Sequence, residues 1–208
     1  MSSLPTIFDD LLVRLYQGRG LSQVGSEPVY YLVFPPQQIV EAKRLLPHFV
    51  KKLSDQGWTV HCFSIAEQIA ALLEQSPLRP FWLDYDHNKP LDWGKANQSL
   101  ANALLPHPAD PFDLAPPEED EDPLAHLPGR LEAFIAAAAQ QPHSVVLVTD
   151  LEALHPYFRI GIVEGRLAGK FLAPTIIFYP GERTGATSLK FLGFYDEDGS
   201  YRSVHVGD

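Results

Sequence analysis

Three side chains with catalytic potential, Asp150, Glu152 and His155, lie in the stretch TDLEALHP, which follows the apolar run SVVLV. A carboxylate at the end of a core strand can hold magnesium, and a nearby histidine can act as a general base. The alternative is structural, because Asp150 or His155 can cap the helix that follows. We favour the cap, since no phosphate-binding loop completes a catalytic site.

The loop after the first apolar run, FPPQQ at residues 34–38, lacks the chemistry of a phosphate site. A P-loop of the form GxxxxGK[ST] surrounds phosphates with glycine amides and a lysine. Here Pro35 and Pro36 remove two amide donors, and the next lysine is Lys43, inside an expected helix. The sequence therefore predicts no phosphate binding at this loop.

A second loop, YPGERTGATS at residues 179–188, also contains glycines and follows the apolar run PTIIF. Gly181 and Gly185 are separated by three residues instead of four, and Ala186 stands where a P-loop has its lysine. The loop leads into a strand, so no helix N-terminus faces an anion. We expect a turn in which Pro180, Gly181 and Gly185 supply special backbone angles.

The other histidines and the cysteine form no metal or nucleophile motif. There is no GxSxG elbow, and Cys62 lies in a run that we expect to be a buried strand, where a thiol is inert. The sequence predicts no metal site, because HxxxH and HExxH spacings are missing among the remaining histidines, which are His48, His61, His87, His107, His126, His143 and His205.

The N-terminus and the cysteine count predict a cytoplasmic protein. A single cysteine suits a reducing compartment, and the acidic, amphipathic N-terminus does not resemble a signal peptide. The apolar runs are also shorter than the roughly 20 residues that span a bilayer.

The negative charge of the chain is concentrated in one segment. Residues 106–123 hold seven acids and no Lys or Arg, and subtracting these seven charges from the net charge of −10 leaves −3 for the remainder. This acidic, Pro-rich segment lacks the apolar groups that would offset the cost of ordering it, so we expect a loop or a disordered insert. No basic stripe is present, which disfavours direct, tight binding of nucleic acid.

Apolar runs alternate with helical periodicity, which is typical of a parallel sheet covered by helices on both faces. The expected strands are residues 29–34, 58–63, 144–151 and 174–179, followed by 188–196 and 201–206 as an antiparallel C-terminal hairpin at the sheet edge. The expected helices are residues 5–17, 39–57, 66–75, 93–105, 124–140 and 155–171. The predicted fold is a three-layer α/β sandwich with a mainly parallel sheet. It forms one domain over residues 1–208, with a P-loop-NTPase-like or Rossmann-like topology that lacks the phosphate loop.

Local signals refine three of these helices. Ser64 can cap the third helix, with Glu67 completing a capping box. Pro47 should kink or split the second helix. Pro156 suits the first turn of the last helix.

Four blocks in the last third, VVLVTDLEALHPYFR, PTIIFYPGERTG, SLKFLGFY and YRSVHVG, resemble in this order the BrxB family of bacterial BREX (bacteriophage exclusion) systems. The resemblance covers roughly residues 144–207. Residues 1–75 agree in length and pattern only, and residues 77–125 resemble no protein family that we recognise. The positions that match the family blocks are His155, Pro156, Arg159, Pro180, Gly181, Gly185 and Arg202.

The resemblance implies a cytoplasmic, non-catalytic component of a phage-defence complex. Members are associated with PglZ, a phosphatase-superfamily protein, and act beside a methyltransferase and a large ATPase. The family has no established catalytic residues, so we assign no catalytic, cofactor or metal site. The implied role is that of an adaptor.

An adaptor needs a binding surface, and arginine and tyrosine dominate the energy of such surfaces. We predict that the partner contacts the loops and hairpin of the C-terminal region, where an edge strand also offers unpaired backbone groups. The residues concerned are Arg159, Arg183, Tyr195, Tyr201 and Arg202. The alternative is that these residues merely cap the sheet.

Two other functions are compatible with the sequence. One is a nucleotide-binding or hydrolytic enzyme that uses Asp150, His155 and Arg183 at the strand ends, which binding of ATP or GTP would reveal. The other is a nucleic-acid-binding module, which steeply salt-dependent DNA binding would reveal.

Overall fold

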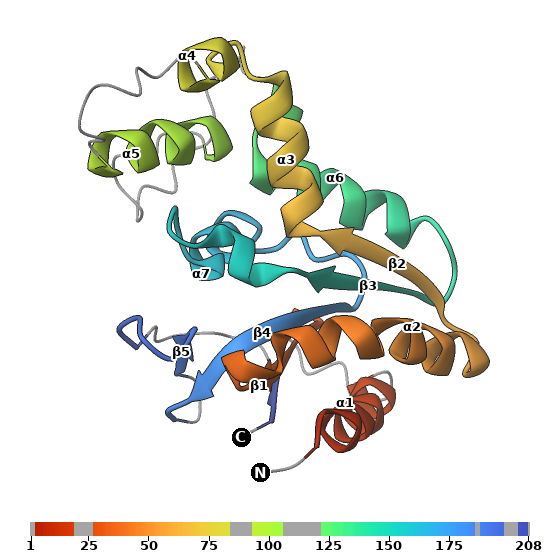
Figure 1. Cartoon of the computed structure of the whole chain (residues 1–208). Helices are drawn as coiled ribbons and strands as arrows, with labels where there is room; N and C mark the ends of the chain where they lie inside the picture. Colours follow the sequence, from red (N-terminus) through yellow and green to blue (C-terminus); the bar gives the residue numbers. More distant parts are fainter. Residues whose placement is uncertain are drawn as a thin grey trace.

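The computed structural model describes residues 3–18, 27–83, 93–105, 122–185, 188–197 and 204–207, and shows an α/β fold built on a mostly parallel sheet (Figure 1). The strand order is β2-β3-β4-β1-β6, with β5 paired to β4. All pairs are parallel except β4–β5. The strands are β1 (Val29–Phe34), β2 (Thr59–Ser64), β3 (Ser144–Thr149), β4 (Thr175–Arg183), β5 (Leu189–Phe191) and β6 (Val204–Val206).

Helices cover both faces of this sheet, which confirms the predicted three-layer sandwich (Figure 1). One layer consists of α1 (Leu4–Gly18) and α2 (Ile39–Asp55), and the other of α3 (Ile65–Gln75), α6 (Leu127–Ala139) and α7 (Ile160–Arg166). The short α4 (Arg79–Leu83), which the sequence did not predict, and α5 (Trp93–Leu104) contact α3. The described residues also form the 3₁₀ turns η1 (Pro36–Gln38), η2 (Pro123–Ala125) and η3 (Leu151–Leu154).

The central strands contribute side chains to both cores, as their continuous apolar runs predicted. In β1, Val29, Tyr31 and Val33 face the α3–α6–α7 layer, while the alternate residues face the α1–α2 layer. The strands β3 and β4 alternate in the same way. The order β2-β3-β4-β1-β6 differs from the doubly wound Rossmann order 3-2-1-4-5-6.

Two of the strand predictions are wrong in detail. The strand β2 lies at the end of the sheet, Phe63 is its one fully buried residue, and Cys62 is exposed. The C-terminal hairpin does not form either, because β5 pairs antiparallel with β4 while β6 pairs parallel with β1. The position beside β1 offers partners for backbone hydrogen bonds, and β6 buries His205 and Val206 there.

The helix predictions hold with one correction, which concerns the last helix. The helix α2 runs through Pro47 as one element, so it is not split, and Gly57 follows its end with a φ of 84°. The last helix starts later than expected, because η3 buries Leu151 and Leu154 before α7 begins at Ile160. Pro156 therefore precedes α7 instead of occupying its first turn.

Among the described residues, no helix combines the length and apolar character that a membrane crossing needs. The predicted acidic insert lies outside the described residues, except for Asp122 and Pro123. The side chain of Asp122 caps η2 by accepting a hydrogen bond from the amide of Leu124 at 2.9 Å.

The imidazole of His205 is buried in β6 with 4% of the residue exposed, and its ring lies edge-on to Tyr31 at 5.4 Å. Burial, together with the positive charge of Arg183, lowers the pKa of His205 to about 4. Below its ordinary pKa of 6.5, the unfolded chain takes up a proton at His205 that the folded protein does not.

We therefore expect the free energy of unfolding to decrease as the pH falls from 6.5 toward about 4. Above pH 6.5, His205 should not contribute to the pH dependence of this free energy. The slope due to His205 should reach about 1.4 kcal/mol per pH unit. Urea unfolding of the wild type and of His205→Asn at several pH values gives the free energy of unfolding of each protein against pH. The difference between the two slopes is the contribution of His205. The control is Val13→Ala on α1, which removes an exposed side chain that has no titratable group and should keep the wild-type slope. Parallel curves for the wild type and His205→Asn would contradict the assignment.

Candidate functional site

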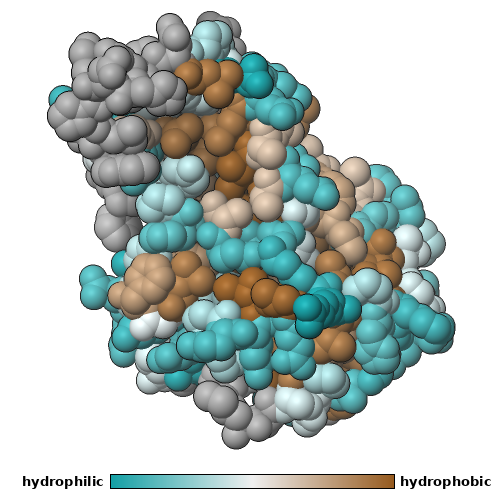
Figure 2. Space-filling model, in the orientation of Figure 1, coloured by the Kyte–Doolittle hydropathy of each residue, from teal (hydrophilic) through white to brown (hydrophobic). Residues whose placement is uncertain are grey.

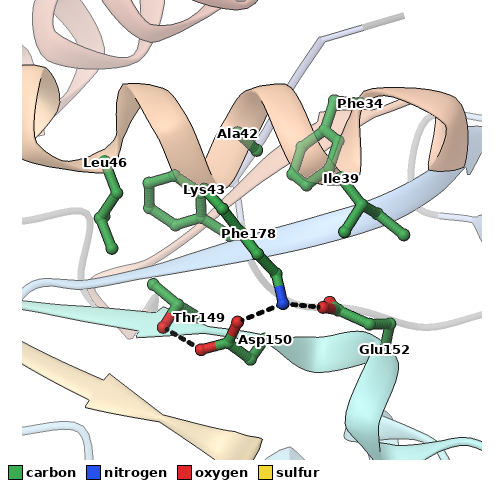
Figure 3. A pocket seen from close by; sticks show the side chains of 9 residues that line it. All are labelled: Phe34, Ile39, Ala42, Lys43, Leu46, Thr149, Asp150, Glu152 and Phe178. Carbon is green, nitrogen blue, oxygen red and sulfur yellow. Dashed lines mark hydrogen bonds and ion pairs between the residues drawn. The ribbon is translucent and has the colours of Figure 1, made fainter.

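The carboxyl ends of the parallel strands β1, β3 and β4 lie at the same edge of the sheet, and the connections that follow β1 and β3 lead to opposite helical layers. The strand β1 leads through η1 into α2 on one face, whereas β3 leads through η3 into α7 on the opposite face. Open α/β sheets bind ligands at such switch points. A pocket of about 200 Å³ lies here, and we call it the switch-point pocket (Figure 3). It is lined by Phe34, Ile39, Ala42, Lys43, Leu46, Thr149, Asp150, Glu152 and Phe178.

A lysine and two carboxylates provide the charged groups of this pocket. Lys43 extends from α2, and its Nζ atom lies 2.7 Å from Oδ1 of Asp150 and 2.6 Å from Oε1 of Glu152 (Figure 3). The other carboxylate oxygen of Asp150 accepts hydrogen bonds from the hydroxyls of Ser64, at 2.6 Å, and Thr149, at 3.0 Å. The ion pair between Lys43 and Asp150 thus joins α2 to the ends of β2 and β3.

These contacts set the protonation of the pocket. Partial burial by itself would raise the pKa of Asp150, but the hydrogen bonds from Lys43 and Ser64 and the charge of Lys43 outweigh it and hold that pKa below its ordinary value. Burial likewise opposes the charged form of Lys43, yet the two carboxylates raise the pKa of Lys43. The two pKa shifts therefore favour the ionised forms of Asp150 and Lys43 at neutral pH.

The backbone of Asp150 turns its carboxylate toward Lys43. Its φ of 59° and ψ of 38° are left-handed, a conformation in which aspartate is enriched among non-glycine residues. The predicted cap is wrong, because the side chain of Asp150 makes no capping bond to η3 within the described residues, and His155 stands at the far end of that turn. The predicted cap of α3 is confirmed, since Ser64 accepts a hydrogen bond from the amide of Glu67 at 3.3 Å.

The pocket does not assemble the catalytic set that the sequence suggested. Of Asp150, His155 and Arg183, it is Asp150 that lines the pocket. The loop after β1 is occupied by Pro35 and η1, whose backbone is wound into a 3₁₀ turn. Within the described part of the chain, no group of three or more His, Cys, Asp or Glu side chains is placed to hold a metal ion.

A second feature, which we call the aromatic–arginine cluster, consists of His155, Arg159, Phe194 and Tyr195. The Nδ1 atom of His155 lies 2.5 Å from the hydroxyl of Tyr195, and Arg159 places its guanidinium 5.1 Å from the centre of the tyrosine ring. Arg159 also donates a hydrogen bond to the carbonyl of Asp196 at 3.1 Å. Phe194 stacks on Tyr195 with 4.8 Å between ring centres.

The turn after β5 brings this cluster together. Leu192 and Gly193 have φ angles of 53° and 73°, so the chain reverses there and places Phe194 and Tyr195 against the segment before α7. Phe194 is 62% exposed. Figure 2 shows hydrophobic surface on the side of the molecule where β5 and α7 lie. An exposed aromatic ring beside an ordered guanidinium can bind another protein.

The structure thus brings together two of the five predicted partner-binding residues, Arg159 and Tyr195. Arg183 lies apart at the end of β4, where its Nε atom donates a hydrogen bond to the carbonyl of Gly185 at 2.9 Å. Tyr201 and Arg202 lie outside the described residues.

Residues 121–206 match the family model of the BREX protein BrxB. The match confirms the resemblance and extends it at its N-terminal end beyond the blocks visible in the sequence, so that it includes α6. Comparisons with curated proteins and with solved structures find no match. The BrxB-like region contains Asp150, Glu152 and the whole aromatic–arginine cluster, whereas Lys43 lies before it.

Two functional candidates were not predicted from the sequence. Lys43 is too far along the chain to serve a P-loop, but its place one turn into α2 directs it toward the ends of β3 and β4. Phe194 stands in the family block SLKFLGFY, and two adjacent aromatic residues after a glycine were the available signal.

The predicted turn at Pro180 and Gly181 is also wrong, because β4 continues through both residues to Arg183. Gly181 pairs with Phe191 of β5, and a Cβ atom there would overlap the carbonyl oxygen of Lys190 and the ring of Tyr179. Gly181 is therefore required for the close approach of two strands and not for an unusual backbone angle.

We expect Gly181→Ala to destabilise the protein by about 1–3 kcal/mol, the usual cost of overpacking. Gly185→Ala, two residues after the end of β4, is the matched control, because its added Cβ would meet Ser188 at an ordinary distance of 3.5 Å. Chemical denaturation of both variants measures the difference. Equal stability of the two variants would show that β4 and β5 can separate without cost.

Proposed function

We propose that this chain is a non-catalytic adaptor of a BREX-type phage-defence complex, which acts in the cytoplasm by binding a PglZ-like phosphatase-superfamily protein. The observation that carries the proposal is the match of residues 121–206 to the BREX protein BrxB. Other BREX components are further partners under this proposal.

The aromatic–arginine cluster is the contact surface that we propose for the partner. Arginine and tyrosine are enriched among residues that dominate binding energy, and here both come from the BrxB-like region. The contacts of Arg159 to Tyr195 and Asp196 hold its guanidinium in place before binding, which reduces the entropy lost on association.

We expect Arg159→Ala and Phe194→Ala each to weaken capture of the PglZ-like protein of the same system by about thirtyfold, equivalent to about 2 kcal/mol. The unfolding temperature of the Phe194 variant should stay near that of the wild type, because this side chain is 62% exposed. A quantitative pull-down paired with a thermal melt of each variant provides the measurement.

The control is Val13→Ala, which removes an apolar side chain that is 55% exposed on α1. It should leave capture unchanged. Full capture by stable Arg159 and Phe194 variants would exclude the cluster from the interface, and loss of folding would make these residues structural.

The switch-point pocket is the observation that favours the second candidate, a nucleotide-binding or hydrolytic enzyme. Asp150 has a lowered pKa and stands at the end of a core strand, where a catalytic carboxylate would lie. Against this candidate, Lys43 is held by two carboxylates, and η1 occupies the place of a phosphate loop.

We therefore expect the purified protein to hydrolyse neither ATP nor GTP. The measurement is phosphate release in the presence of magnesium, compared with a blank prepared from cells that lack the gene. Turnover that is well above this blank and is abolished in Asp150→Ala would establish the enzyme and overturn the proposal.

A further inference from the structure

The position of Lys43 shows that one cationic group fits between the two carboxylates of the switch-point pocket. A single ammonium contacts Asp150 at 2.7 Å and Glu152 at 2.6 Å at the same time. Asp150 is oriented by Ser64 and Thr149 independently of this lysine. The second carboxylate oxygen of Glu152 takes no further hydrogen bond within the described residues, so acceptor capacity is left over.

Charge and lining determine what else the pocket can accept. One lysine faces two acids, so the ionised groups among its lining residues sum to −1. The walls are otherwise apolar, formed mainly by Phe34, Ile39, Leu46 and Phe178 (Figure 3). This combination suits a cationic head on an apolar stem and disfavours phosphate or carboxylate ligands.

Lys43 itself is displaceable. Its side chain is 52% exposed, so water screens its ion pairs with the two carboxylates, which are themselves partly exposed. The long, flexible stem can therefore move into solvent at little cost. Asp150 cannot do the same, because it is held by two hydroxyls at the end of β3.

We infer that the switch-point pocket is an anchor site for an arginine side chain of a protein partner, and that Lys43 fills this position in the unbound chain. The planar guanidinium can donate to both carboxylates at once, which an ammonium does less well. The volume of about 200 Å³ is below the roughly 300–1,000 Å³ of pockets for drug-sized molecules and admits a single side chain. This inference rests on the proposed adaptor function and specifies the chemistry of the partner.

The test uses the full chain and N-acetyl-arginine amide as the probe, followed by NMR of the methyl groups of Ile39 and Leu46. We expect saturable shifts with this probe and none with the neutral analogue N-acetyl-citrulline amide. Glu152→Gln should weaken binding, whereas Lys43→Ala should tighten it about fivefold, because it removes an internal competitor worth up to about 1 kcal/mol. Should Lys43→Ala fail to fold, Lys43→Met keeps the stem and removes the charge.

The control is Lys51→Ala on the same helix, which should leave the affinity unchanged because Lys51 pairs with Asp55 outside the pocket. Three results would overturn the inference. They are equal binding of the citrulline analogue, binding of free arginine but not of the blocked probe, and loss of binding in Lys43→Ala. Saturable shifts of the same methyl groups with inorganic phosphate or Mg²⁺ instead of the probe would also overturn it.

Partner capture separates this inference from the adaptor function. If the wild type captures the PglZ-like protein and Glu152→Gln captures it equally well, the adaptor role stands and the arginine anchor is wrong. If the wild type captures no such protein, the adaptor role in this form fails, while the probe titration still decides the chemistry of the pocket.

Discussion

The parallel pairing of β1 with β4 is the interaction on which the rest of the structure depends. It joins all six residues of β1 to residues 175–180, and β6 pairs with the other side of β1. The strands β4 and β6 belong to the BrxB-like region, but they do not touch each other in the sheet order. A strand from outside the matched region therefore completes its sheet, and the same strand leads into the helix that carries Lys43.

This arrangement explains why the candidate site combines residues from distant parts of the sequence. Ser64 ends β2 and caps α3, Asp150 follows β3, and Lys43 comes from the opposite layer. The carboxylate of Asp150 connects all three segments. Asp150 is only partly buried, so solvent screens these contacts.

The sequence predicted those features that are encoded by adjacent residues. Strands buried on both faces require a continuous apolar run, so β1, β3 and β4 were evident, as was the Ser64 cap of α3. The edge position of β2 was not, because a run of similar residues does not reveal whether a neighbouring strand is present. The pairing of β6 with β1 depended on a free sheet edge, which is a property of the assembled fold.

The candidate site was also predictable only where adjacent residues encode its features. The position of Asp150 after an apolar run identifies it as a candidate site residue. The sequence predicts a helix cap, whereas the structure shows an ion-pair partner of Lys43. The contact with Lys43 crosses more than a hundred residues of sequence, and no local pattern encodes it. Similarly, Arg159 and Tyr195 were identified by type, while their contact arises from the turn at Leu192 and Gly193.

The place of β1 between β4 and β6 also affects the protein while it is being synthesised. Val29–Phe34 leaves the ribosome before Thr175 is made, and at about 5–20 residues per second this delay is on the order of ten seconds. During that time the segment VYYLVF is an apolar, β-prone hexapeptide without either of its strand partners, the type of sequence that aggregates between chains. Pro28 precedes it and Pro35 and Pro36 follow it. Because proline donates no backbone hydrogen bond, these residues stop intermolecular pairing from spreading past either end of the segment while the nascent chain waits for β4.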